Sequence, residues 1–209
     1  MAGSGSALIV VDVQNDFCPG GALAVPGGDE VVPIANRLMA KFDHVILTQD
    51  WHPGDHASFA ANNPGMEPFS MTEMPYGPQI LWPVHCVQGT PGAAFHADLV
   101  TDRASLIVRK GFHSHIDSYS AFLENDRKTP TGLAGALRDR GINDLVLVGL
   151  ATDFCVHYSA TDAVMLGFGV TVLEDGCRAI DLDGSLAAAR AEMAARGVTL
   201  ATSDHLKAA

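Results

Sequence analysis

The sequence predicts an α/β protein built on a doubly wound, Rossmann-like parallel sheet of about six strands, with helices on both faces. Short runs that are nearly continuous in Val, Ile and Leu recur along the chain, as expected of strands buried on both faces. Helix-like segments lie between most of these runs. With 209 residues, of which 47% are hydrophobic, the chain can close one core, so we expect a single domain over 1–209.

The expected strands and helices alternate in chain order. Strands are predicted at 8–13, 44–49, 105–110, 145–150 and 170–175, with a weaker one at 198–202. Helices are predicted at 29–42, 131–141, 152–168 and 183–197. Alternation of this kind is typical of one doubly wound parallel sheet, and neither an internal repeat nor a linker to a second domain interrupts it.

Two segments depart from this pattern. Residues 2–6, AGSGS, predict a flexible N-terminal tail. Residues 50–104 hold seven of the eleven prolines and show no clear periodicity. A loop of this length inside a compact domain is usually functional, so we expect it to carry part of a site as a long insertion. The simpler alternative is a mobile surface insertion.

Composition and charge exclude several classes of partner. The chain has 13 Lys and Arg against 24 Asp and Glu, a net charge of −11, which repels nucleic-acid phosphates and anionic lipid. The apolar run at 7–11 is too short to span a membrane or to form a signal peptide. We therefore expect a cytoplasmic protein with free thiols at its four cysteines and with neither nucleic acid nor membrane as a partner.

Polar or nucleophilic residues follow four of the predicted strands. Asp12, Asp50 and Lys110 lie at the ends of the first three, and Cys155 comes five residues after the end of the fourth. In an open parallel sheet, ligands bind beyond the carboxyl ends of the strands, so these side chains are expected along one edge. Each alone has a structural explanation as a turn former, a cap, a strand end or a small core residue. Their convergence favours a functional site.

Cys155 is placed to act as a nucleophile. Thr152 or Asp153 can cap the predicted helix, which puts the sulfur in the first turn, beside unpaired backbone N–H groups and the positive end of the helix dipole. This position is expected to lower the pKa of the thiol, and the same N–H groups can hold an oxyanion. Asp12 is then a candidate base for the thiol proton, and Lys110 a cation that positions both and keeps Asp12 ionised.

The long loop supplies candidate metal ligands. Asp50 and His52 are two residues apart, so on an extended chain their side chains point the same way. His85 provides a third ligand, and two His plus one carboxylate leave coordination positions open for water or substrate, as Zn, Fe or Mn would accept. His56 and Asp55 offer a further ligand or a contact to a ligand. The alternative is that these histidines only stabilise turns.

Four aromatic residues lie next to the proposed site residues in the sequence. A flat ring-shaped substrate could bind in a slot between such side chains, although aromatic residues are more often part of the core. The candidate lining residues of this slot are Phe17, Trp82, Tyr119 and Phe154.

Several stretches resemble one known family. VDVQNDFCPGGALAVPGG at 11–28, TQDWHP at 48–53, WPVHCVQGT at 82–90, the Lys110–Gly111 turn and GLATDFCV at 149–156 are similar to the nicotinamidases, or pyrazinamidases, of the isochorismatase-like cysteine hydrolase superfamily. The similarity extends through nearly the whole chain. It implies an amidohydrolase that converts nicotinamide, and pyrazinamide, to the carboxylic acid and ammonia through a cysteine thioester, in NAD salvage.

The resemblance also implies roles for particular residues. Asp12, Lys110 and Cys155 match the catalytic triad, and Asp50, His52 and His85 match the ligands of one divalent metal ion that meets the pyridine nitrogen of the substrate. His56 matches a residue that is a metal ligand in some members and lies behind the ligands in others. The amides of Ala151 and Cys155 are expected to form the oxyanion hole, with Leu150–Ala151 as a cis peptide.

Other functions are compatible with parts of the pattern. N-carbamoylsarcosine amidase and ureidoacrylate hydrolase keep the triad but need no metal for a ring nitrogen, and isochorismatase lacks the nucleophilic cysteine. A hydrolase that uses metal-bound water, with Cys155 as a bystander, is one alternative, and a non-catalytic protein with Cys155 as a sensor thiol is another. Ammonia release and its sensitivity to thiol alkylation distinguish these. The expected partner is a small-molecule amide substrate, and assembly into a homo-oligomer is compatible with the sequence.

Overall fold

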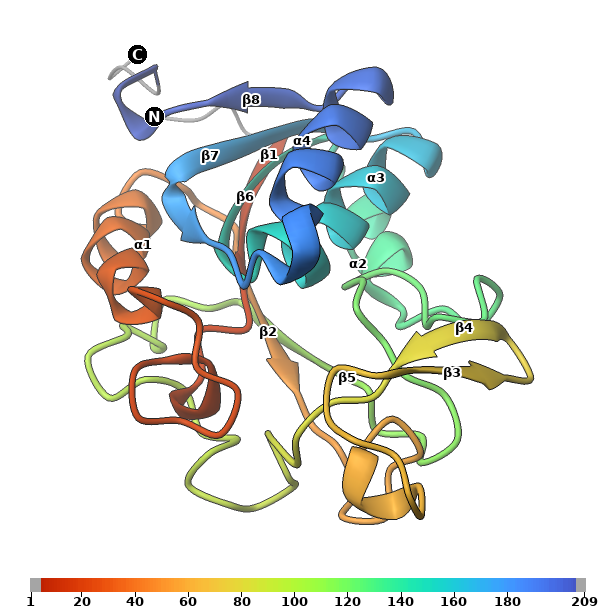
Figure 1. Cartoon of the computed structure of the whole chain (residues 1–209). Coiled ribbons are helices and arrows are strands. Elements are labelled where there is room, and N and C mark those ends of the chain that lie inside the picture. Colours follow the sequence, from red (N-terminus) through yellow and green to blue (C-terminus); the bar gives the residue numbers. More distant parts are fainter. Residues whose placement is uncertain (1–4, 206–209) are drawn as a thin grey trace.

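The computed structural model describes residues 5–205, which form a six-stranded parallel sheet (Figure 1). The strand order is β5-β2-β1-β6-β7-β8, and every neighbouring pair is parallel. The strands are β1 (Ser6–Val11), β2 (Val45–Asp50), β5 (Leu106–Lys110), β6 (Asp144–Leu150), β7 (Gly169–Arg178) and β8 (Thr199–Ala201). All six predicted strands are therefore confirmed, with bounds shifted by up to three residues.

Helices cover both faces of the sheet. Helix α1 (Val31–Met39) lies on one face, and α2 (Leu133–Asp139), α3 (His157–Met165) and α4 (Ser185–Ala195) lie on the other (Figure 1). The central strands β1 and β6 are buried along almost their whole length, which explains their continuous apolar sequence. The predicted doubly wound α/β fold is confirmed.

The segment over 50–104 has more structure than the sequence predicts. It contains an antiparallel hairpin of β3 (Met71–Met74) and β4 (Gly77–Ile80), which stands apart from the main sheet. Phe59, Trp82 and Cys86 are buried, so much of the segment packs against the body of the protein. This packing favours the functional interpretation over a mobile surface insertion.

Two further expectations need adjustment. The helix predicted at 152–168 begins with a π-helical turn over Thr152–Val156 before α3 starts at His157. Of the tail predicted at 2–6, residues up to 4 lie outside the described part, and Ser6 already begins β1. Within residues 5–205, no helix is both long enough and apolar enough to cross a membrane.

Candidate active site

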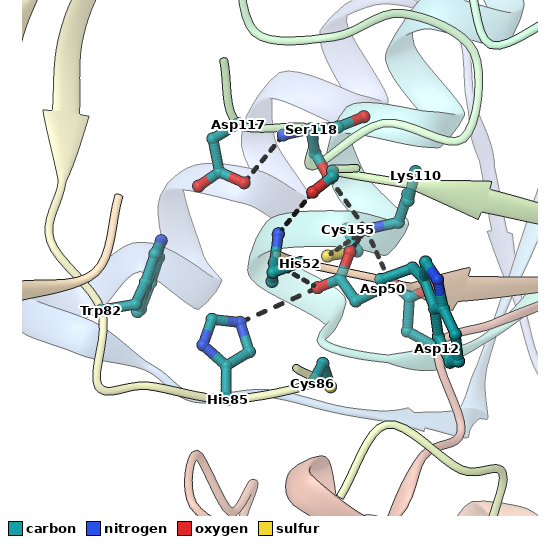
Figure 2. Close-up of polar contacts among 12 residues, drawn as sticks. Asp12, Asp50, His52, Trp82, His85, Cys86, Lys110, Asp117, Ser118 and Cys155 are labelled. Atoms are coloured by element: carbon teal, nitrogen blue, oxygen red, sulfur yellow. Dashed lines mark hydrogen bonds and ion pairs between the residues drawn. The ribbon is translucent and has the colours of Figure 1, made fainter. Parts of the chain in front are cut away.

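The strand order brings the four predicted strand-end residues together. Strands β5, β2, β1 and β6 are consecutive in the sheet, and Lys110 on β5 pairs directly with Asp50 on β2. Asp12 follows β1, and Cys155 lies in the turn after β6. Figure 2 shows these four side chains pointing toward one another. The predicted convergence at one edge of the sheet is confirmed.

Lys110 is the centre of this cluster. Its ammonium group lies 2.8 Å from Asp12 Oδ2, donates to Asp50 Oδ1 and to the Ser118 carbonyl at 2.9 Å, and lies 3.4 Å from Cys155 Sγ. Burial acts to lower the pKa of Lys110, but the two carboxylates outweigh it and hold that pKa well above its ordinary value. The lysine is therefore charged. Its side chain is 0% exposed, so Lys110 is part of the buried site and not a solvated strand end.

Asp12 has a second partner that sequence reasoning missed. The Thr48 hydroxyl donates to Asp12 Oδ1 at 2.6 Å and accepts from the Asp12 amide at 3.1 Å. Burial raises the pKa of Asp12, while Lys110 and Thr48 act in the opposite direction. A carboxylate with a raised pKa is a better proton acceptor, as general base catalysis requires. A polar Thr directly after the apolar run 45–47, two residues before Asp50, is the sequence feature that could have revealed this contact.

Cys155 holds its proton in this environment. Burial raises the pKa of the thiol well above its ordinary value, Lys110 opposes the shift, and the negative charges of Asp12 and Asp50 add to it. The predicted lowering of the thiol pKa is therefore wrong. The positive end of a helix is outweighed here by burial beside two carboxylates. Activation of Cys155 thus requires a base at the moment of attack, and a carboxylate oxygen of Asp12 lies within 4.8 Å of the sulfur.

The local structure around Cys155 differs from the predicted cap. Neither Thr152 nor Asp153 caps the helical turn with its side chain. Asp153 instead accepts hydrogen bonds from the amides of Ile180 and Asp181 at 3.1 and 2.7 Å, which ties the turn to the segment after β7. The peptide bond Leu150–Ala151 is cis, as predicted. Ala151 and Cys155 both line the adjoining cavity, whereas their role as an oxyanion hole stays a prediction.

Asp50, His52 and His85 form a cluster that can hold a metal ion. Their ligand atoms all lie within 4.8 Å of one another. Each histidine directs Nδ1 to a backbone carbonyl at 2.8 Å, His52 to Gly111 and His85 to Pro83, which leaves Nε2 facing Asp50 Oδ2. Outer hydrogen bonds of this kind fix the ring orientation of metal-binding histidines. The residues present therefore fit a divalent metal.

The charge states of His85 and Asp50 agree with metal binding. Burial acts to lower the pKa of His52, but Asp50 outweighs it and raises that pKa, so metal binding must displace a proton from His52. Burial, together with the neighbouring His52, lowers the pKa of His85 to about 4, so its imidazole is neutral. Burial acts to raise the pKa of Asp50, but Lys110 and the histidines outweigh it, and the carboxylate is ionised. Gly111 has φ +65°, and a Cβ there would lie 2.4 Å from the His52 ring, so only glycine leaves room for that ring.

His56 belongs to a neighbouring group. Its Nδ1 contacts the Ser58 hydroxyl at 2.8 Å and its Nε2 the Ile116 carbonyl at 3.2 Å. It groups with His52 and Asp117 and not with Asp50 and His85. Two roles were left open for His56, that of a metal ligand and that of a residue that contacts the ligands. Its side-chain contacts support the second role. Sequence reasoning did not identify Asp117, because this residue follows no predicted strand.

A cavity adjoins the nucleophile and the metal cluster. All four predicted aromatic residues line it, and Trp82, Tyr119 and Phe154 meet edge to face, with ring centroids 5.0 to 6.0 Å apart. Leu23, Asp117 and Ile180, which sequence reasoning missed, complete the wall. The cavity therefore offers flat apolar surfaces beside a nucleophile and a cation site, which suits a small aromatic ring.

The fold and the site together define the class of this protein as a hydrolase built on a doubly wound parallel sheet. A family model described as the isochorismatase domain matches residues 6–205, and the chain belongs to that family. This confirms the superfamily that the sequence motifs resemble.

Curated relatives and solved structures agree with this family assignment. The nicotinamidase of Acinetobacter baylyi is 55% identical over 200 residues, which cover 96% of this chain and 94% of the relative. A nicotinamidase/pyrazinamidase structure from Acinetobacter baumanii has a TM-score of 0.98 and 55% identity, and the match covers 99% of this chain and 100% of that one.

Two more distant structures contain ligands. The yeast nicotinamidase Pnc1p bound to the inhibitor nicotinaldehyde has a TM-score of 0.88 and 33% identity, with 94% of this chain and 99% of that one covered. The pyrazinamidase of Pyrococcus horikoshii in complex with zinc has a TM-score of 0.77 and 37% identity, with 95% and 99% covered.

Proposed function

We propose that this protein is a nicotinamidase that hydrolyses nicotinamide, and pyrazinamide, to the carboxylic acid and ammonia through a thioester on Cys155. The 55% identity to a nicotinamidase over nearly the full length of both chains supports the substrate. The observation that carries the mechanism is that Cys155 lines a cavity beside a cluster of metal ligands, with Lys110 3.4 Å from its sulfur and an Asp12 oxygen within 4.8 Å. The reaction belongs to NAD salvage.

In the first half of the proposed reaction, Asp12 takes the proton of Cys155 and the sulfur attacks the carboxamide carbon. The amides of Ala151 and Cys155 face the oxygen on which negative charge develops. Asp12 then gives the proton to the departing amino group, the C–N bond breaks, and ammonia leaves. Lys110 stays protonated throughout and stabilises the negative charge of Asp12 and of the thiolate.

In the second half, Asp12 takes a proton from water, and the resulting hydroxide attacks the thioester carbon. The C–S bond breaks, nicotinic acid leaves and ionises to nicotinate in solution, and the proton on Asp12 passes to the sulfur. The proton taken from Cys155 thus leaves with ammonia, and a proton from water replaces it, so the triad ends the cycle as it began it. No histidine is required as the base.

Asp50, His52 and His85 are proposed to hold one divalent ion, Zn, Fe or Mn. Such an ion, when bound, supplies a Lewis acid to which the ring nitrogen of the substrate binds. The three protein ligands leave coordination positions open for this purpose. Trp82, Tyr119, Phe154 and Phe17 are proposed to enclose the ring, so that the carboxamide carbon is held near the sulfur.

Ammonia release tests the proposed function. The purified, metal-loaded protein should release ammonia from nicotinamide and pyrazinamide, and far less from N-carbamoylsarcosine or ureidoacrylate, which carry no ring nitrogen. Absence of ammonia from every amide would favour the sensor-thiol alternative. Treatment with a thiol-alkylating agent should abolish the release, whereas a hydrolase that uses metal-bound water would keep it.

A further inference from the structure

The side-chain amide of Gln79 lies behind the aromatic wall of the cavity. Gln79 is on β4 of the hairpin, is 1% exposed and does not line the cavity itself. Its Nε2 lies 2.7 Å from the Tyr119 hydroxyl and 2.9 Å from Asp117 Oδ2. Its Oε1 accepts from Asn125 Nδ2 at 3.0 Å. Figure 1 shows the hairpin, in yellow, beside the green segment that carries these partners.

The Tyr119 hydroxyl joins Gln79 to a second cavity residue. The same oxygen accepts a hydrogen bond from Trp82 Nε1 at 3.0 Å. The hydroxyl thus receives one donor from the hairpin and one from the cavity wall. The rings of Tyr119 and Trp82 meet nearly at right angles, at 81°, and each meets Phe154 edge to face. The orientation of this wall therefore depends on where the hydroxyl is held.

We propose that Gln79 is a positioning residue that fixes Tyr119 and, through its hydroxyl, Trp82, and thereby sets the width of the slot for an aromatic ring amide. This inference rests on the proposed function for the identity of the ring. Gln79 acts on substrate binding and not on the reacting atoms, because it contacts none of Asp12, Lys110 and Cys155. Two anchored rings also lose less conformational freedom when substrate binds.

The variant Gln79→Met tests the proposal. Methionine is unbranched and of similar length, so it fills the same space, but its side chain has no donor for Tyr119. We expect the KM for nicotinamide to rise about tenfold, which corresponds to the net worth of about one buried hydrogen bond. We expect kcat to fall by less than about threefold, because loss of substrate binding leaves the chemical step unchanged.

A double-mutant cycle shows whether Gln79 acts through the hydroxyl. Tyr119→Phe removes the shared acceptor, so adding Gln79→Met to it should raise KM no further. Tyr76→Phe is the matched control, because Tyr76 donates to Gln79 Oε1 at 3.2 Å and its loss leaves the donors on Nε2 in place. This control should keep the KM of the unmodified protein.

Three results would overturn the proposal. The first is a KM of Gln79→Met within about twofold of that of the unmodified protein. The second is that the effects of Gln79→Met and Tyr119→Phe on KM simply add. The third is a fall in kcat at constant KM that follows the loss of folded protein. The last of these would mean that Gln79 only stabilises the fold.

A spectroscopic test does not depend on turnover. Trp51 and Trp82 are the two tryptophans of the chain, so Trp51→Phe leaves Trp82 as the only tryptophan emitter. In that background, Gln79→Met should shift the emission of Trp82, and an unchanged spectrum would contradict the proposal. If the unmodified protein released no ammonia from nicotinamide, the proposed function would fail, and this spectrum would still decide the role of Gln79.

Discussion

At the scale of single residues, the site depends on one buried cation between two buried carboxylates. Lys110, Asp12 and Asp50 are each at most 4% exposed, and the lysine contacts both acids. A buried ion pair contributes little net stability when it is complete, but removing one partner leaves an uncompensated charge in the interior. In this site the lysine has two such partners, and it also lies beside the sulfur of Cys155.

Lys110→Met should therefore reduce both turnover and stability. We expect the free energy of unfolding at neutral pH to fall by about 3–5 kcal/mol, because Asp12 and Asp50 then face each other without a cation. Without Lys110 the pKa of both carboxyls rises, so the folded variant binds protons more tightly than the unfolded chain. Its deficit should consequently shrink as pH falls. Denaturant unfolding of both proteins between neutral and acidic pH measures this, and an equal deficit at all pH values would contradict it.

The sequence predicted the residues of this cluster better than their surroundings. Asp12, Asp50 and Lys110 could be found because parallel strands end at one edge, which is a property of the chain order alone. Asp117 could not be found in that way, because it follows no predicted strand and its contacts join distant segments. The pKa of Cys155 was predicted with the wrong sign, because burial is a property of the whole fold and the helix terminus is a local one.

At the scale of elements, the turn that carries Cys155 is held by its own acid and by the segment after β7. Asp153 accepts from the amides of Ile180 and Asp181 and from the Ser185 hydroxyl at 2.5 Å, and Ile180 lines the cavity. Residues 152–168 were predicted as one helix because a single π-helical turn of five residues is too short to interrupt the helical pattern of the sequence. The hairpin was missed because its two strands are only four residues long, are mostly half-exposed or exposed, and include Pro78, so they show no clear alternation of apolar and polar residues.

Asp153→Ala should loosen this connection. We expect a loss of about 3 kcal/mol in the free energy of unfolding, because the charge-assisted hydrogen bonds that the buried Asp153 carboxylate accepts from two backbone amides and the Ser185 hydroxyl are lost. We also expect a lower kcat, since the turn that carries Cys155 and the loop that carries Ile180 are no longer held together. Asp153→Asn keeps one acceptor oxygen, so its stability and kcat should lie between those of Asp153→Ala and those of the unmodified protein. Thermal unfolding and ammonia release measure the two effects, and a fully stable, fully active Asp153→Ala would contradict this account.

At the scale of the whole molecule, the open sheet supplies a rigid edge and the long insertion supplies the rest of the site. The strands fix Asp12, Asp50 and Lys110, while the insertion brings His52, His85 and Trp82 over the same edge (Figure 2). The fold class followed from strand and helix alternation. The path of the insertion did not, because proline-rich segments without periodicity give no pattern from which a path can be predicted.

Removal of the proposed metal should weaken substrate binding without changing the reactivity of Cys155. Metal that binds only the folded chain stabilises it by mass action, so dialysis against a chelator should lower the melting temperature and weaken nicotinamide binding. Since binding requires a neutral His85 and an ionised Asp50, metal affinity should fall as pH is lowered. Cys155 should still react with a small alkylating agent, because its contacts to Asp12 and Lys110 remain. Elemental analysis, thermal unfolding and thiol labelling check this, and a melting temperature indifferent to chelation would speak against the site.

The thioester on Cys155 is the central claim, and rapid acid quenching during turnover tests it most directly. Mass spectrometry of the quenched protein should find the pyridinecarbonyl group on Cys155, because the acyl group stays on sulfur after ammonia leaves. Cys155→Ala should retain its metal and bind nicotinamide without releasing ammonia. Appreciable ammonia release by metal-loaded Cys155→Ala, together with no adduct on the unmodified protein, would contradict the account and favour attack by metal-bound water.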